Sequence, residues 1–232
     1  MFKAIICTTI IVPLLVSATD AYAEEVEGSE FEVSGVIMTT HNYNGGIIGV
    51  TVSEGTHIQG VLSVDHKSGM FVETFTSTDA ILSANDPAGN FEGEVDLSVG
   101  YRGTKGEVSY QIDYSVFWID TANGVKNIQN VRAFVNWNRE NGPSFYAAGQ
   151  LFVTEDFGPG KGLAYKAGAR FEGFNLEAGG HTGLFRQDAA AVSFVRAGWS
   201  GEVKGLGVSA YVQKGLADPI EDTFSVSVVH RF

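Results

Sequence analysis

The chain has 232 residues, including 29 glycines and 5 prolines, and only 18% of its residues are charged. This charged share is below the quarter that is usual in soluble proteins, while the mean hydropathy is close to zero. The net charge of −12 argues against nucleic acid as a partner, because phosphate binding needs clustered lysine and arginine.

The first 23 residues have the pattern of a secretory signal peptide. Lys3 precedes an apolar run over residues 4–16, and residues 21–23 form an A-x-A cleavage site. A membrane anchor is the alternative, but Pro13 interrupts a run already shorter than the ~20 apolar residues of a spanning helix. Cleavage removes Lys3 and Asp20, so the net charge stays at −12, with 14 basic against 26 acidic residues.

Cleavage also removes Cys7, the single cysteine, which excludes disulfides and cysteine-ligated metals from the mature chain. After residue 23, no apolar run approaches the length of a transmembrane helix. We therefore expect a short acidic lead-in over residues 24–30 and one β-domain over residues 31–232. An exported chain of this kind is periplasmic, secreted or an outer-membrane barrel.

Alternation of apolar and polar residues predicts about twelve strands. The clearest is the hairpin over residues 91–118, where Val95, Leu97 and Val99 share one face. The predicted strands cover residues 31–40, 58–66, 70–77, 91–102, 107–118, 131–138, 144–154, 163–171, 174–181, 191–200, 206–214 and 223–232. Short turns at 67–69, 103–106, 139–143, 172–173 and 201–205 alternate with longer loops, which include 41–55 and 120–130.

Two features favour a transmembrane, antiparallel up-and-down barrel over a soluble β-sandwich. Short turns alternate with longer loops, as periplasmic turns and extracellular loops do in outer-membrane barrels. Aromatic residues of the apolar faces also cluster beside the short turns, as a ring at a membrane interface would. These aromatic residues are Phe71, Tyr101, Trp137, Phe145, Phe171, Phe174, Trp199 and Phe232.

Glu73 disagrees with this pattern. The alternation places it on the lipid face with Phe71 and Phe75, where a charge is costly. Either Glu73 lies near an interface, or a bulge shifts the register of its strand.

The last ten residues read T-F-S-V-S-V-V-H-R-F and form the closing strand. They resemble the aromatic-ended last strand that the barrel-assembly machinery reads in outer-membrane proteins. The residues of its apolar face, and of the expected assembly signal, are Phe224, Val226, Val228, His230 and Phe232. This strand is expected to pair with residues 31–40, so that no strand edge is left unpaired in lipid.

If the apolar faces meet lipid, the opposite faces line a lumen that carries both signs of charge. Acids dominate the wall formed by the second to fifth strands, and bases dominate the wall formed by the sixth to tenth. The predicted pore-lining residues are Asp65, Glu94, Asp96, Glu107, Asp113, Arg132, Lys166, Arg170, Glu177 and Arg196. We expect a field across the pore that orients small polar solutes.

The alternative is a lumen plugged by ion pairs between the two walls, with a structural or adhesion role for the barrel. A barrel of about twelve strands lies between the filled barrels of ~8 strands and the wide channels of ~16. Four aromatic side chains also point inward and would narrow the bore: Phe134, Tyr146, Phe152 and Tyr211.

Residues 58–66 and 68–75 read I-Q-G-V-L-S-V-D-H and S-G-M-F-V-E-T-F, and residues 95–101 and 205–212 continue in similar style. These stretches resemble the TorF family of porins, the Gcw_chp type of conserved hypothetical outer-membrane proteins. The resemblance implies an outer-membrane barrel with a pore and no catalytic residues. The chain departs from the family's Tyr…Arg-Gly element, since Ile48 precedes Gly49 where arginine is expected.

An outer-membrane hydrolase is the remaining alternative. It would need a nucleophile and a base at the outer rim, where His181 is a candidate, yet the chain contains no G-x-S-x-G motif. We expect no catalytic, cofactor or metal site. The expected partners are outer-membrane lipid, lipopolysaccharide, the barrel-assembly machinery and small polar solutes, and the sequence makes no prediction of oligomeric state.

Overall fold

The structure is a computed structural model that describes residues 29–45, 47, 50–78, 91–121, 124–155, 162–182, 190–217 and 220–232. The predicted signal peptide and most of the acidic lead-in lie outside the described residues. Across the described part of the chain, no helix is long and apolar enough to cross a membrane.

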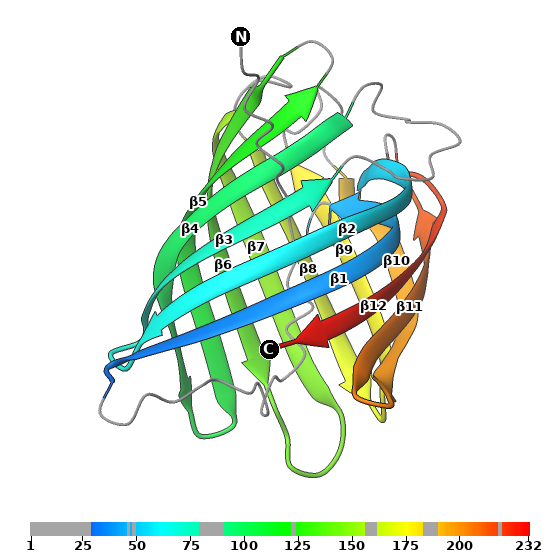
Figure 1. The fold of residues 1–232 in the computed structure, drawn as a ribbon. Helices are drawn as coiled ribbons and strands as arrows, with labels where there is room; N and C mark the ends of the chain where they lie inside the picture. The colour runs from blue at the N-terminus through cyan, green and yellow to red at the C-terminus, as the bar shows by residue number, and fades with distance from the viewer. Residues whose placement is uncertain are drawn as a thin grey trace, which may run out of the picture.

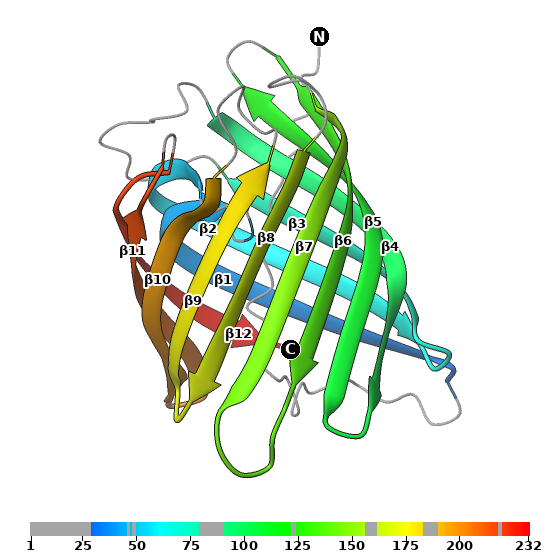
Figure 2. The same ribbon diagram turned by 180° about the vertical axis from the view of Figure 1, so that it is seen from behind.

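Twelve strands form one closed antiparallel barrel, in which each strand pairs with its neighbours in the chain and β12 returns to β1 (Figures 1 and 2). This confirms the predicted fold class and the predicted number of strands. The strands are β1 (Phe31–Gly45), β2 (Val50–His66), β3 (Met70–Thr78), β4 (Phe91–Lys105), β5 (Val108–Thr121), β6 (Lys126–Trp137), β7 (Ser144–Glu155), β8 (Gly162–Phe171), β9 (Phe174–Thr182), β10 (Ala190–Val203), β11 (Leu206–Gly215) and β12 (Thr223–Arg231).

The seam between β1 and β12 closes the barrel. Its register runs from Val36 opposite Arg231 to His41 opposite Val226. Beyond β12, the Gly35 N–H donates to the Phe232 carbonyl at 2.8 Å, and the Phe232 N–H donates to the Gly35 carbonyl at 3.0 Å. The Phe232 ring lies over Gly35, because a Cβ there would be only 2.2 Å from Cε2 of the ring. The predicted pairing of the closing strand with residues 31–40 is therefore present.

Two expected loops are largely strand. The pairing of β1 with β2 continues to Gly45 opposite Val50, and β5 and β6 occupy much of residues 120–130. Ladder hydrogen bonds continue there although the apolar alternation has ended, because the backbone pairs regardless of side-chain polarity. Asn42 supports the extension at a bulge, with a φ of 58°. Its side chain accepts from the Gly55 N–H at 3.1 Å and donates to the Phe224 carbonyl at 2.8 Å.

The outer surface of the barrel is apolar. The alternate residues that point outward include the exposed Leu97, Val99, Ile112, Tyr114 and Val135. Seven of the eight aromatic residues expected in the ring beside the short turns are also exposed. Neighbouring members pack together there, with Trp137 and Phe145 centroids 5.9 Å apart. A barrel with this surface needs an apolar surrounding phase.

The prediction was wrong for Phe71 and Glu73. On β3 the outward residues are Met70 and Val72, which are about half exposed, whereas Phe71 and Phe75 are only 2% and 3% exposed inside the barrel. The pairing of β3 with β2 and β4 is regular, so no bulge is needed. The error was one of phase: in this strand the aromatic residues face inward, and Glu73 faces inward with them.

The Phe232 contacts predict a role in barrel closure. Replacing Phe232 with Ala removes the ring that covers Gly35, and we expect less folded barrel in the outer membrane, measured by the heat-modifiable band on a gel. Phe171→Ala is the matched control, because Phe171 is equally exposed on the outer face but lies within a hairpin. Equal loss of folded barrel in the two variants would contradict a special role for Phe232.

Candidate functional site

Nine of the ten predicted pore-lining residues point into the barrel, where they are buried or half-buried. Glu107 differs from the expectation. β5 begins at Val108, so Glu107 lies in the exposed turn before it. Its carboxylate accepts a hydrogen bond of 2.8 Å from Nε1 of Trp137, which belongs to the outer face. The strand alternation does not apply to a residue in a turn.

One wall of the interior, formed by β2 to β5, is mainly acidic. The inward acids on this wall are Asp65, Glu73, Glu94, Asp96 and Asp113. Arg102 stands among them and was missed by the sequence reasoning. Arg102 Nε donates to Asp65 Oδ1 at 2.5 Å, its NH1 lies 3.4 Å from Glu73 Oε2, and its guanidinium covers the Phe71 ring at 4.4 Å. Extending the alternation of β4 to its last residues would have found it.

Arg132 of β6 joins the acidic wall to the next one. Its Nε donates to Asp113 Oδ1 at 2.7 Å, and its NH2 donates to the Ser98 hydroxyl at 2.9 Å. Asp113 also accepts from the Ser115 hydroxyl at 2.6 Å and from the Gln111 amide at 2.8 Å. Because buried charges are costly unless they are paired and hydrogen-bonded, these contacts are what makes the ion pair tolerable.

The other wall carries a row of polar residues that face one another across five strands. Tyr146, Gly168, Glu177, Arg196 and Gln213 are successive partners on β7, β8, β9, β10 and β11. The Tyr146 hydroxyl donates to Glu177 at 2.7 Å, and Arg196 donates to Glu177 at 2.5 Å and to Gln213 at 2.6 Å. The charged groups are thus bonded along the wall, between neighbouring strands, and not across the lumen.

Gly168 allows Tyr146 to reach Glu177. The Tyr146 ring crosses β8 at the position of Gly168, where a Cβ would lie 2.5 Å from the Tyr146 oxygen and 2.6 Å from the Leu176 carbonyl oxygen. Lys166 and Arg170 therefore flank this ring. The Lys166 Nζ lies 3.1 Å from Glu177, and the Arg170 guanidinium is 4.4 Å from the ring centroid.

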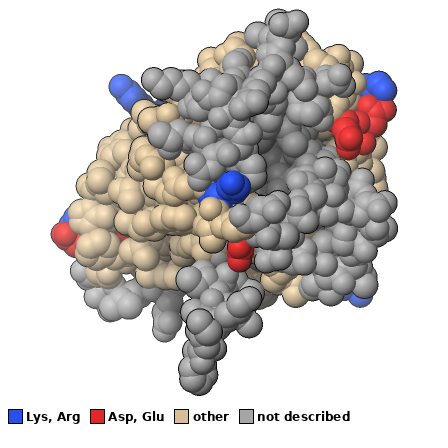
Figure 3. All heavy atoms as spheres, turned by 90° about the horizontal axis from the view of Figure 1, so that it is seen from above, with Lys and Arg blue, Asp and Glu red and all other residues tan. Residues whose placement is uncertain are grey.

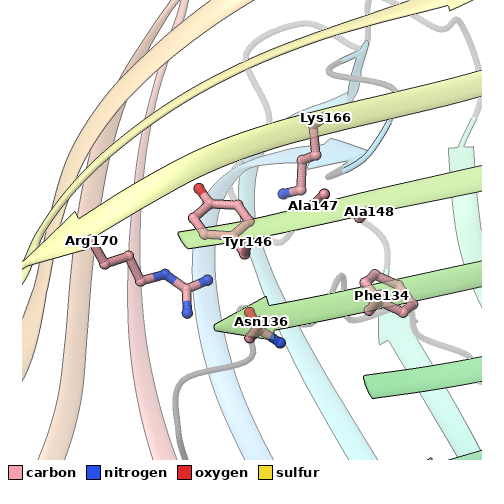
Figure 4. Close-up of a pocket in the computed structure, with 7 residues that line it drawn as sticks. All are labelled: Phe134, Asn136, Tyr146, Ala147, Ala148, Lys166 and Arg170. Atoms are coloured by element: carbon pink, nitrogen blue, oxygen red, sulfur yellow. The ribbon is translucent and has the colours of Figure 1, made fainter. Parts of the chain in front are cut away.

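A cavity opens beside this ring, with about 250 Å³ of empty space that includes open solvent. Figure 4 shows its lining side chains converging from three adjacent strands, β6, β7 and β8. The polar lining residues are Asn136, Tyr146, Lys166 and Arg170, and Phe134 closes one side.

An apolar cluster fills part of the interior next to the charged walls. Its aromatic members are Phe75, Phe117, Phe134 and Phe152, all at most 7% exposed. Ile47, from the connection between β1 and β2, belongs to the same cluster. Of the four aromatic residues expected to point inward, Phe134 and Phe152 lie in this cluster, whereas Tyr146 and Tyr211 pack under Arg170 and Arg196.

At the end with the longer loops, the described charges stand apart at the rim and form no single patch (Figure 3). One ion pair holds the last connection, where Lys214 Nζ lies 2.7 Å from Asp222. This hydrogen bond, together with one from the Gly215 N–H, lowers the pKa of Asp222 below its usual value. Across the described ranges, no group of three His, Cys, Asp or Glu residues is arranged to hold a metal ion.

The buried pair of Arg132 and Asp113 predicts a large, pair-specific stability effect. Arg132→Ala leaves the Asp113 carboxylate without its ion-pair partner, and we expect a loss of about 3–5 kcal/mol in the free energy of unfolding. The double variant Arg132→Met with Asp113→Leu removes both charges and should recover most of that loss. Urea unfolding of the refolded barrel measures both values, and a double variant no more stable than the single one would contradict this account.

The close approach of Tyr146 to Gly168 predicts a second effect. Gly168→Ala should destabilise the barrel by about 1–3 kcal/mol, because the new methyl group overlaps the Tyr146 hydroxyl and a backbone carbonyl. Gly149→Ala on the neighbouring strand is the control, since its Cβ would meet nothing closer than 3.9 Å. Similar unfolding midpoints in urea for the two variants would disprove the proposed constraint.

No protein-family model matches the chain, and no curated protein matches it. The fold is nevertheless similar to that of solved porin structures. A structure of the KdgM porin in complex with disordered oligogalacturonate has a TM-score of 0.50 and 10% identity, over 86% of this chain and 99% of that one. A second KdgM porin structure gives 0.49, 11%, 86% and 99%, and a Salmonella typhi OmpF complex with daunomycin gives 0.41, 9%, 87% and 97%. The likeness shows a shared barrel fold, and membership of the TorF family stays a prediction.

Proposed function

We propose that this protein is an outer-membrane channel for the passive diffusion of small polar solutes and ions. The observation that carries the proposal is the separation of charge inside a closed barrel. Five acids and Arg102 point inward from β2 to β5, whereas four bases and Glu177 point inward from β6 to β10. A soluble domain would have no evident use for a polar, charged interior inside an apolar surface.

The separated charges would act on solutes through the field between the two walls. Clefts with low-dielectric walls focus such fields and raise the local concentration of counter-ions. The ion pairs run between neighbouring strands, so they reduce the field without abolishing it. The apolar cluster around Phe117 and Phe134 narrows the interior, which restricts passage to small solutes.

The outer surface supports the location. Exposed apolar side chains cover the strands, and aromatic side chains gather beside the short turns, as in barrels that sit in the bacterial outer membrane. The proposed partners are accordingly outer-membrane lipid and lipopolysaccharide, with the barrel-assembly machinery as the route of insertion. The signal-peptide pattern of residues 1–23 agrees with export.

A plugged barrel with a structural role is the second candidate. One observation favours it: Ile47 of the β1–β2 connection is 3% exposed among the apolar residues of the interior cluster. A connection that packs inward at this point would close part of the bore.

Channel recordings in a planar bilayer separate the two candidates. The refolded protein should show single-channel steps that shrink as neutral solutes of increasing size enter the bore, whereas a plugged barrel gives no steps. In a KCl gradient, Asp96→Asn should shift the reversal potential toward anion preference and Arg170→Gln toward cation preference. Arg139→Gln, in an exposed turn, is the control and should leave it unchanged. Unaltered reversal potentials in both interior variants would refute the field.

A further inference from the structure

The cavity beside Tyr146 differs from the rest of the interior in its charge. Lys166, Arg170 and Arg196 bring three positive charges to this part of the wall, and Glu177 brings one negative charge. Both Glu177 oxygens are already engaged, Oε1 by Arg196 and Oε2 by Lys166 and the Tyr146 hydroxyl. The surplus of positive charge therefore lies beside the cavity and is not cancelled within the cluster.

The lining groups are donors that suit a planar anion. The Arg170 guanidinium is held against the Tyr146 ring, 4.4 Å from its centroid, which orients its fork of N–H groups. The Asn136 amide lines the same space and makes no side-chain hydrogen bond to any described residue. Figure 4 shows Arg170 and Asn136 directed toward one another, with Lys166 on the other side of the ring.

We propose that this cavity is a binding site for a small carboxylate anion, with Arg170 as its bidentate partner, Asn136 as an amide donor and Lys166 as a second positive charge. Arginine and a carboxylate match in planar, two-bonded geometry, which a single ammonium cannot provide. The space of about 250 Å³ is smaller than the pockets that hold drug-sized ligands, so the anion is a short organic acid. This inference rests on the proposed channel, and it names anionic solutes as the class that pauses at the basic wall.

Gly168 is part of this design. Without a side chain at this position, the Tyr146 ring can lie across β8 and separate Lys166 from Arg170. The ring also carries the hydroxyl that occupies Glu177, and this leaves less of the Glu177 carboxylate to neutralise Arg170.

Calorimetric titration of the refolded wild-type barrel in detergent tests the site directly. Succinate should bind with one saturable site at low salt, and its uncharged analogue succinamide should not bind. Arg170→Gln should weaken succinate binding at least about tenfold, because a charge-assisted hydrogen bond is lost. Arg170→Lys should restore only part of it, and the exposed-turn variant Arg139→Gln should bind as the wild type does. Folding of each variant is checked by its heat-modifiable gel band.

Three outcomes would overturn the site: no saturable succinate binding, equal binding by Arg170→Gln and the wild type, or tighter binding of inorganic phosphate than of succinate. The last result would assign the cavity to phosphate in place of carboxylate. Channel recordings in succinate distinguish this failure from failure of the proposed function. Binding without conductance refutes the channel and keeps the site, whereas conductance without binding refutes the site and keeps the channel.

Discussion

The hydrogen-bonded seam between β1 and β12 is the interaction on which the whole structure depends. A sheet in hydrocarbon cannot leave an edge of N–H and C=O groups unpaired, because no water is available to satisfy them. The seam pairs Val36 with Arg231 and ends with Gly35 bonded to Phe232 on both sides. Once the edge is closed, each strand has one face outside and one face inside, and the two faces can evolve for different phases.

The inside face then solves a problem that the outside face does not have. Charges inside a narrow barrel are partly removed from water, and each must find a partner nearby. The strand register supplies these partners: Asp113 lies opposite Arg132, and Glu177 lies opposite Arg196. Pairing between neighbouring strands leaves acids concentrated on one wall and bases on the other. The same contacts that make the charges stable therefore allow a field to exist across the bore.

Local space decides how these groups behave. Gly168 permits Tyr146 to engage Glu177, so the basic wall keeps a positive surplus beside a cavity. On the acidic wall, Arg102 engages Asp65 and Glu73 and covers Phe71. The apolar cluster with Ile47 limits the bore in between. Selectivity, in this view, results from a few close contacts within an otherwise regular lattice of strands.

The sequence by itself determined the number of strands, the outward face of most of them and the closure by residues 223–232, because a period of two marks a strand between two phases. It also placed most of the inward charges, since these follow the same alternation. The phase of β3 failed, because Phe71 and Phe75 are as apolar as lipid-facing residues and a short strand offers few others to fix the phase. Only the tertiary structure decided that Glu73 pairs with Arg102, that Glu107 lies in a turn, and that Tyr146 crosses Gly168 to Glu177. Such contacts depend on the register between strands, and one strand's alternation carries no information about its neighbour's register.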